Sequence, residues 1–114
     1  MLDARIAAMN RYDAEATTAF FSKDAVLEEI ENGALATTST GRQEVAARFD
    51  YLLSIAKSVS LRNWTGTTTQ IGPYVAQPYS WSSEGNVTDG RGFLVFRLDE
   101  SGKIAHEWVI VDAR

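Results

Sequence analysis

The fold of this chain is decided by residues 92–112, which read GFLVFRLDESGKIAHEWVIVD. Two apolar runs in this stretch flank the segment Asp99–Gly102, whose Asp, Ser and Gly residues are typical of a tight turn. Because both runs are rich in β-branched and aromatic residues, they predict two antiparallel strands joined as a hairpin. Glu107 interrupts the second run. An ionised carboxylate is costly to bury without a partner, so Glu107 is a candidate functional residue.

A second carboxylate-bearing strand is predicted over residues 24–31, which begin DAVLEEI. Side chains alternate along a strand, so Glu29 shares one face with Leu27, and Glu28 lies on the opposite face. The pattern alone does not decide which of the two glutamates faces the interior of the domain.

The side chains of the last predicted strand also alternate between the two faces of the sheet. Glu107 shares its face with Val109 and Val111, whereas His106 and Trp108 face the other way. His106 is the only histidine of the chain, and we interpret it as facing solvent or a partner subunit.

The opening residues predict two short helices. Residues 2–11 have apolar side chains at helical spacing, and Asp13 is placed to cap a second helix that ends near Ser22.

A third helix is predicted to follow a small-residue loop at residues 34–40. Thr40 and Gln43 fit a capping box, and the helix then runs to about Lys57. One apolar stripe along this helix consists of Val45, Phe49, Leu52, Leu53 and Ala56.

The remainder of the chain is predicted to be β-structure. Residues 59–71 and 74–82 read as strands and precede the closing hairpin. Early helices followed by a meander of strands are typical of an α+β domain, in which helices cover one face of an antiparallel sheet. A curved sheet closed by helices leaves a cavity, and ligands bind at the mouth of such a cavity.

The composition excludes several classes of function. The 114 residues suffice for one domain, 1–114, and carry a net charge of −4 without a Lys/Arg cluster, so no nucleic-acid partner is expected. The absence of cysteine and the single histidine argue against a metal site. No apolar stretch approaches the roughly 18 residues of a membrane span, and no secretory signal is evident. We therefore expect a cytoplasmic protein with no membrane partner.

Three motifs in this order resemble a known superfamily. They are NRYD at residues 10–13 with AFFSKDA at 19–25, GRQEVA at 41–46 and FRLDESGKI at 96–104. Their order and spacing resemble the SnoaL-like polyketide cyclases and the ketosteroid isomerases, which belong to the nuclear transport factor 2-like superfamily. The resemblance covers nearly the whole chain after residue 10. It implies a cystatin-like cone, with three N-terminal helices packed on a curved antiparallel sheet around a central cavity.

The resemblance also implies site residues. The general base of the isomerases falls on Glu29, and the acid–base carboxylate of the cyclases corresponds best to Glu107. The positions of the isomerases' oxyanion-hole pair fall on about Arg5 and on Leu94, which do not match that pair.

These features imply a function as well as an alternative to it. The first reading is a cofactor-independent isomerase or cyclase that transfers protons with Glu29 and Glu107 on a small hydrophobic molecule, polyketide-like or steroid-like. No cofactor or metal is implied, because proton transfer needs only carboxylates with suitable pKa values. The alternative is a non-catalytic small-molecule-binding or dimerisation module of the same fold.

Further expectations concern the ligand, stability and assembly. Residues expected to contact the ligand are Phe49, Leu53, Leu94 and Val109. If desolvation and the charge of Glu29 raise the pKa of Glu107, Glu107→Gln should stabilise the fold or leave it unchanged. The outer sheet face, which carries Phe93 and Trp108, has more apolar surface than a small monomer normally exposes, so it predicts a homodimer.

Overall fold

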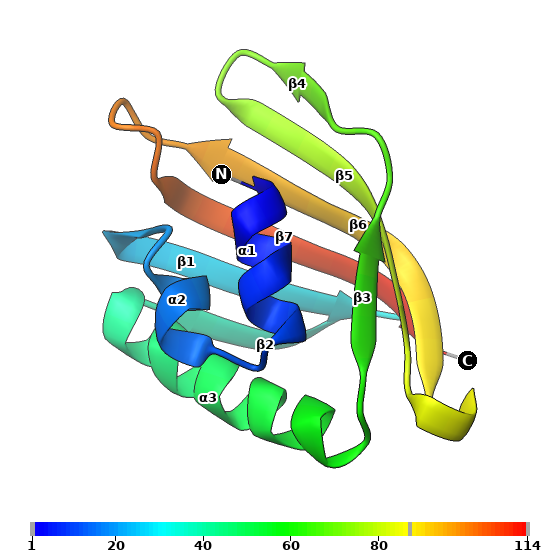
Figure 1. Ribbon diagram of the computed structural model, residues 1–114. Helices are drawn as coiled ribbons and strands as arrows, with labels where there is room; N and C mark the ends of the chain where they lie inside the picture. The colour runs from blue at the N-terminus through cyan, green and yellow to red at the C-terminus, as the bar shows by residue number, and fades with distance from the viewer. Residues whose placement is uncertain (1, 87, 114) are drawn as a thin grey trace.

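The computed structural model describes residues 2–86 and 88–113 (Figure 1). The helices in this part of the chain are α1 (Leu2–Asn10), α2 (Ala14–Thr18), α3 (Arg42–Ser58) and a short 3-10 helix, η1 (Glu84–Asn86). The strands are β1 (Phe21–Glu31), β2 (Ala34–Thr40), β3 (Arg62–Thr65), β4 (Thr69–Ile71), β5 (Tyr74–Ser82), β6 (Asp89–Leu98) and β7 (Ile104–Ala113).

All strands belong to one sheet with the order β2-β1-β7-β6-β5-β3, and β4 pairs with β5. The neighbouring strands are antiparallel except β1 and β7, which are parallel. The predicted α+β fold is thus confirmed, with one pair that departs from the antiparallel pattern. Helix α3 joins β2 to β3, and the later meander β5–β6–β7 brings β7 back beside β1 in the same direction (Figure 1).

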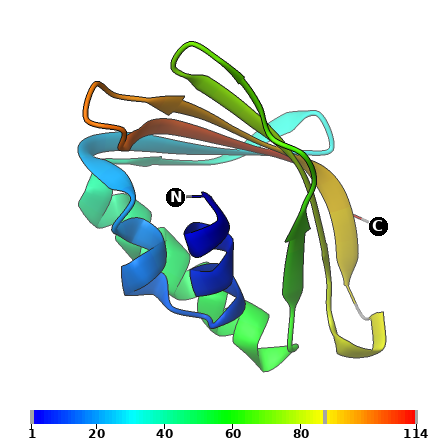
Figure 2. The same cartoon turned by 45° about the horizontal axis from the view of Figure 1, so that its top comes forward.

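The sheet is strongly curved and the helices lie on its concave side. Figure 2 shows α1 beneath the arch of the sheet and α2 and α3 along its open side. The interior of the domain is therefore bounded by α1 and α3 on one side and by the central strands on the other.

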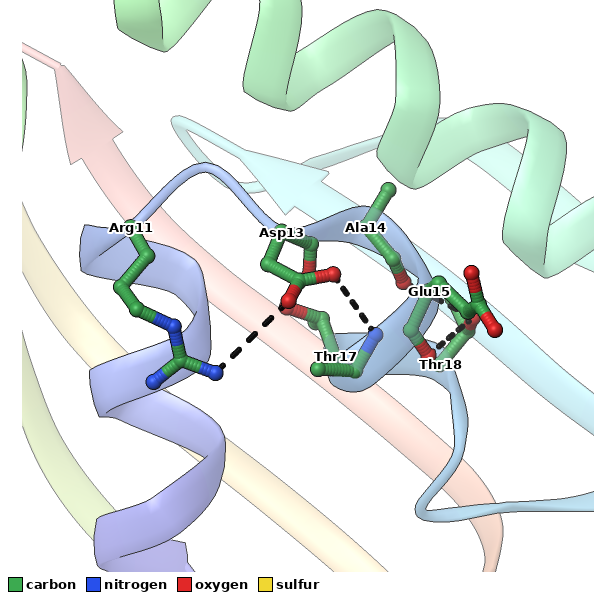
Figure 3. A network of polar contacts seen from close by, with 7 residues as sticks. Arg11, Asp13, Ala14, Glu15, Thr17 and Thr18 are labelled. Atoms are coloured by element: carbon green, nitrogen blue, oxygen red, sulfur yellow. Dashed lines mark hydrogen bonds and ion pairs between the residues drawn. The ribbon is translucent and has the colours of Figure 1, made fainter.

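The junction between α1 and α2 is held by side-chain caps (Figure 3). Asp13 caps α2 as predicted, since its Oδ1 accepts a hydrogen bond from the backbone N–H of Ala16 at 3.0 Å. The hydroxyls of the buried Thr17 and Thr18 donate to backbone carbonyls one turn earlier. The helix ends at Thr18 and β1 begins at Phe21, so the predicted helix end near Ser22 is wrong.

The predicted loop at residues 34–40 is also wrong, because these residues form strand β2. They pair with β1 in an antiparallel ladder, and most of their side chains are exposed. An edge strand of this kind is held by backbone hydrogen bonds, so its side chains carry no buried apolar pattern. The predicted capping box is wrong for a related reason, because Thr40 ends β2 and Gly41 is the N-cap of α3. The backbone N–H of Thr40 donates instead to Glu44.

The predicted strand at residues 59–71 consists of two shorter strands, β3 and β4, whereas β5 spans the predicted residues 74–82. Residues 66–68 separate β3 from β4, and the backbone N–H of Gly66 donates to the carbonyl of Pro78. The chain therefore leaves the regular ladder between the two segments.

Helix α3 buries the predicted apolar stripe. Val45, Phe49, Leu53 and Ala56 are buried, and Leu52 is half-buried. The Phe49 and Phe21 rings pack at a centroid distance of 5.9 Å, which fixes the helix against β1.

We expect Phe49→Ala to lower the free energy of unfolding by about 3–5 kcal/mol, because the phenyl ring is buried and its loss leaves a cavity. Urea denaturation would measure the change. The matched control is Ile55→Ala on the exposed side of α3, which should stay within about 0.5 kcal/mol of the parent. A Phe49 variant as stable as the control would show that α3 contributes no core packing at this position.

Two glycines shape the concave face of β6. A Cβ at Gly92 would lie 1.8 Å from the backbone oxygen of Ile110, and a Cβ at Gly90 would lie 2.2 Å from the ring of Trp81. A side chain would therefore collide with its neighbours at either position. The absence of a side chain at Gly90 leaves the space in which the Trp81 ring lies over the backbone of β6.

Candidate functional site

A cavity of about 190 Å³ lies between the helices and the concave face of the sheet. The four residues predicted to contact a ligand, Phe49, Leu53, Leu94 and Val109, all line it, and so do Glu29 and Glu107. The cavity wall is mainly apolar. Its polar lining residues are Arg5, Glu29, Glu31, Asn63, Tyr79 and Glu107.

Glu107 lies in this cavity because of the alternation along β7. Its side chain is fully buried, with 0% exposed surface, and it faces the concave side with Val109 and Val111. In the parallel ladder it stands opposite Leu27 of β1. Glu29 is also buried on this side, so the structure resolves the choice between Glu28 and Glu29 in favour of Glu29 as the inward residue.

Glu107 forms a buried ion pair with Arg5 of α1. Nη2 of Arg5 donates to Oε1 of Glu107, and both side chains have at most 1% exposed surface. The Arg5 guanidinium carbon lies 5.1–5.7 Å from the ring centroids of Phe21, Phe49 and Phe96. The guanidinium is thus enclosed by one carboxylate and three aromatic rings.

The ion pair leaves several polar atoms without partners. Among the described residues, Nε and Nη1 of Arg5 and Oε2 of Glu107 have no hydrogen-bond partner. Burial raises the pKa of Glu107, the charge of Arg5 opposes that shift, and the negative charge of Glu29 adds to it. Glu107 therefore combines a free oxygen with a carboxyl pKa above the ordinary glutamate value.

Glu29 is held differently, by Arg48 of α3. Nε and Nη2 of Arg48 donate to the two carboxylate oxygens of Glu29 at 2.7 and 2.9 Å. This two-point geometry is the strong form of an arginine–carboxylate pair, and the hydrogen bond to Glu29 raises the pKa of Arg48.

The two inward carboxylates have separate partners. No hydrogen bond joins Glu29 to Glu107 in the described structure, and each glutamate is paired with its own arginine. Neither arginine was predicted from the sequence as a partner of a glutamate. Arg5 could have been found from its position, because it shares a buried helix face with Ala8 and Met9 at the i+3 and i+4 positions.

A hydrogen-bonded cluster holds the wall formed by β3 and β5. The Tyr79 hydroxyl donates to Oδ1 of Asn63, and Nδ2 of Asn63 donates to Oδ1 of Asn10 at 3.0 Å. Burial raises the pKa of Tyr79, so its phenol is neutral. Because the hydroxyl proton is directed at Asn63, this cluster fixes the position of the Tyr79 ring against the cavity.

His106 lies on the opposite, outer face of the sheet, as the alternation predicts. Its Nε2 is 2.7 Å from Oε1 of Glu28, and its ring stacks on Trp108 at a centroid distance of 3.8 Å. His106 and Glu28 are therefore not part of the cavity.

No group of three or more His, Cys, Asp or Glu side chains within residues 2–86 and 88–113 is arranged to hold a metal ion. The described helices include none that is both long and apolar enough to cross a membrane.

Comparison with known families agrees with this architecture. The model of the SnoaL-like domain matches residues 2–107. The chain belongs to the SnoaL-like family. Among curated proteins, none matches the sequence of this SnoaL-like chain.

Solved structures share the SnoaL-like fold at low sequence identity. SalBIII, described as an epoxide hydrolase/cyclase-like enzyme in pyran ring formation in the polyether salinomycin, superposes with a TM-score of 0.77 at 19% identity, over 96% of this chain and 86% of that one. RV0760c from Mycobacterium tuberculosis gives a TM-score of 0.74 at 20% identity, over 93% and 86% of the two chains.

A putative polyketide cyclase, SMa1630 from Sinorhizobium meliloti, gives a TM-score of 0.72 at 16% identity, over 99% of this chain and 92% of that one. Other similar structures are described as cystatin-like folds, which confirms the predicted fold type. At these identities the likeness establishes the fold and leaves the reaction to be argued from the site.

Proposed function

We propose that this SnoaL-like protein binds a small hydrophobic molecule in the cavity and acts on it as a cofactor-independent isomerase or cyclase. The observation that carries the proposal is Glu107, a fully buried carboxyl in a mainly apolar cavity with one oxygen free of hydrogen bonds. A carboxyl in such a position has the raised pKa that general acid–base catalysis uses. SalBIII and the putative cyclase SMa1630 support this class of reaction by their described activities.

In the proposed mechanism, Oε2 of Glu107 removes a proton from a carbon next to a carbonyl group. The protonated carboxyl then returns the proton to another carbon of the molecule. Alternatively, the carbanion attacks a second carbonyl carbon of the same molecule and closes a ring, and the carboxyl returns its proton to the alkoxide oxygen that forms there. We assign the proton transfer to Glu107 rather than Glu29, because both oxygens of Glu29 accept hydrogen bonds from Arg48.

The size of the cavity favours a compact ligand. Ligand pockets usually measure about 300–1,000 Å³. The cavity of about 190 Å³ is smaller, which favours a molecule of one or two rings. The structure of RV0760c in complex with estradiol-17β-hemisuccinate supports hydrophobic ring systems as the ligand class.

Hydrogen–deuterium exchange tests the catalytic proposal. β-Tetralone, a two-ring ketone, should exchange the hydrogens next to its carbonyl in deuterium oxide faster with the protein than without it, as followed by NMR. Glu107→Gln should lower the protein-dependent rate by about 100-fold or more, because it removes the base. Glu28→Gln on the outer face is the matched control and should leave the rate unchanged.

A protein-dependent exchange rate that is equal in the parent and in Glu107→Gln would contradict the proposal. Binding of β-tetralone without any exchange would favour the second candidate, a non-catalytic binding module. The observation in favour of that candidate is that Arg48 donates hydrogen bonds to both carboxylate oxygens of Glu29. Of the two predicted catalytic carboxylates, only Glu107 then keeps a free oxygen for proton transfer.

We also propose that the protein is a homodimer through the outer sheet face. A continuous apolar row crosses this face in cross-strand register and consists of Leu35, Ile30, Ile110, Phe93 and Pro78. Phe93 is 51% exposed and Ile110 is 40% exposed, and a wide hollow lies beside them on the same face. A self-complementary contact would cover this surface.

Light scattering at micromolar concentration should therefore report a dimer for the parent and a monomer for Ile110→Lys, because a lysine in the apolar row opposes association. Ile55→Lys on the exposed side of α3 is the control and should remain dimeric. A monomeric parent would rule out this interface.

A further inference from the structure

The part of the cavity wall formed by β3 and β5 carries a hydrogen-bonded chain of three side chains, Tyr79, Asn63 and Asn10. Tyr79 and Asn63 line the cavity, and Asn10 is the last residue of α1. We infer that the hydroxyl oxygen of Tyr79 accepts a hydrogen bond from the ligand, so that the cavity favours molecules with a hydroxyl or N–H group at the end away from Glu107. The inference rests on the proposed function, because it adds a chemical feature to the ligand of the same cavity.

The direction of each hydrogen bond in this chain is set by the backbone of Asn63. Its N–H donates to Oδ1 of Asn10 at 2.8 Å and its carbonyl accepts from Nδ2 of Asn10 at 3.0 Å, so the amide of Asn10 has a single orientation. The side chain of Asn63 then turns its own Nδ2 towards Oδ1 of Asn10, because two amide oxygens 3.0 Å apart would repel each other. Oδ1 of Asn63 is left facing Tyr79, and the tyrosine hydroxyl supplies the proton between them.

The Tyr79 hydroxyl therefore meets a ligand as an acceptor rather than as a donor. Rotation of its proton towards the ligand would leave Oδ1 of the buried Asn63 without a donor, and an unpaired buried acceptor is costly. Burial also raises the pKa of Tyr79, so the hydroxyl keeps its proton. Within residues 2–86 and 88–113, the only hydrogen bond of this hydroxyl is the one that it donates to Asn63, so the lone pairs of its oxygen remain available.

Tyr79 and Glu107 stand on different parts of the cavity wall. Tyr79 lies on β5, two strands from β7, and the register runs from Tyr79 through Gly92 of β6 to Val111, four residues beyond Glu107. From the usual strand and residue spacings, the two backbone positions are separated by roughly 10 Å across the strands and 13 Å along them, a gap that the inward side chains shorten. A ligand of one or two rings can therefore meet Glu107 with one end and Tyr79 with the other.

Calorimetry on the full chain tests the inference with substituted forms of β-tetralone. The probes are its 6- and 7-hydroxy derivatives, each compared with the fluoro derivative at the same position, which is similar in size but has no proton to donate. At neutral pH we expect the hydroxy compound that fits better to bind about fivefold or more tightly than its fluoro counterpart, the effect of one hydrogen bond to a neutral acceptor.

Three variants separate the acceptor from the ring and from the fold. Tyr79→Phe keeps the ring and removes the oxygen, so the preference for the hydroxy compound should fall below about twofold. Tyr12→Phe is the matched control, because the Tyr12 hydroxyl donates to the carbonyl of Leu61 at 3.0 Å outside the cavity, and it should keep the preference. Asn63→Leu frees the proton of Tyr79, so the affinity of the methoxy derivative relative to the fluoro derivative should rise about fivefold over the parent.

Equal affinities of the parent for the hydroxy and fluoro compounds, or an unchanged preference in Tyr79→Phe, would overturn the inference, whether or not Asn63→Leu folds. If none of the β-tetralone derivatives binds, the inference and the proposed function fall together. Deuterium exchange of β-tetralone without any preference for a hydroxyl group would overturn the inference alone. A preference for the hydroxy compound without deuterium exchange would support the role of Tyr79 and remove only the catalytic part of the proposed function.

Discussion

Arg5→Met should lower the free energy of unfolding by about 3–5 kcal/mol at neutral pH, because it leaves the charge of Glu107 buried without a counter-charge. Both side chains are excluded from solvent, so water cannot replace the lost partner. Urea denaturation of the parent and the variant would measure the difference. In the double variant Arg5→Met with Glu107→Gln the loss should be smaller, since neither charge remains in the interior.

The pH dependence of this loss has a definite sign. Burial raises the pKa of Glu107, and Arg5 opposes that rise, so removal of Arg5 raises the pKa further. A carboxyl with a raised pKa in the folded state costs stability as the pH rises through the unfolded value towards the folded one. The destabilisation by Arg5→Met should therefore be smaller at about pH 4 than at neutral pH. A loss that is independent of pH would show that Arg5 contributes by packing alone.

The ion pair also revises the expected effect of Glu107→Gln. The sequence-based expectation of unchanged or increased stability assumed a carboxylate without a basic partner. Arg5 would keep its positive charge opposite a neutral amide, so the substitution should destabilise the fold. Activity measurements on this variant need a parallel measurement of its folded fraction.

The second large effect concerns the curvature of the sheet. Gly92→Ala should lower the free energy of unfolding by more than about 4 kcal/mol, since the added methyl group collides with backbone. The Cβ would lie 1.8 Å from the carbonyl oxygen of Ile110, an atom fixed in the ladder between β6 and β7. Gly66→Ala is the control with a milder contact, because its Cβ would lie 3.1 Å from side-chain atoms of Pro78, which need to shift by only a few tenths of an ångström.

Denaturation midpoints and soluble yield would both report the difference between these variants. The Gly66 variant should stay within about 1 kcal/mol of the parent. If Gly92→Ala were as stable as Gly66→Ala, the strand would have room to shift, and the curvature of the sheet would not depend on this position.

The sequence predicts the parts of this fold that depend on local periodicity. Alternation along β7 puts Glu107 and His106 on opposite faces of the sheet, and alternation along β1 separates Glu28 from Glu29, as in the structure. The choice of Glu29 as the inward residue came from the resemblance to the isomerases. Strand β2 was not predicted, because its exposed side chains show no alternating apolar pattern in the sequence. Its extended conformation is held by backbone pairing with β1.

The partners of the two glutamates could not be predicted by the same reasoning. Arg5 and Glu107 are separated by 102 residues, and Arg48 reaches Glu29 from another element across 19 residues. Periodicity assigns a residue to a face, but it does not say which charged side chain from a distant element will meet it. The resemblance to the isomerases assigned the base to Glu29. In this chain both carboxylate oxygens of Glu29 accept hydrogen bonds from Arg48 instead.

The pairing of β1 with β7 determines when the cavity forms during folding. Strand β7 lies between β1 and β6 in the sheet, so the two halves of the sheet meet only when this late segment inserts between them. Arg5, near the other end of the described chain, gains its counter-charge in that same step. Pairing of such distant segments is a slow event in folding, because the loop between them must close first. Until β7 inserts, the cavity lacks Glu107, Val109 and Val111, the β7 residues that line it. Binding of a ligand in the cavity would therefore report completed folding.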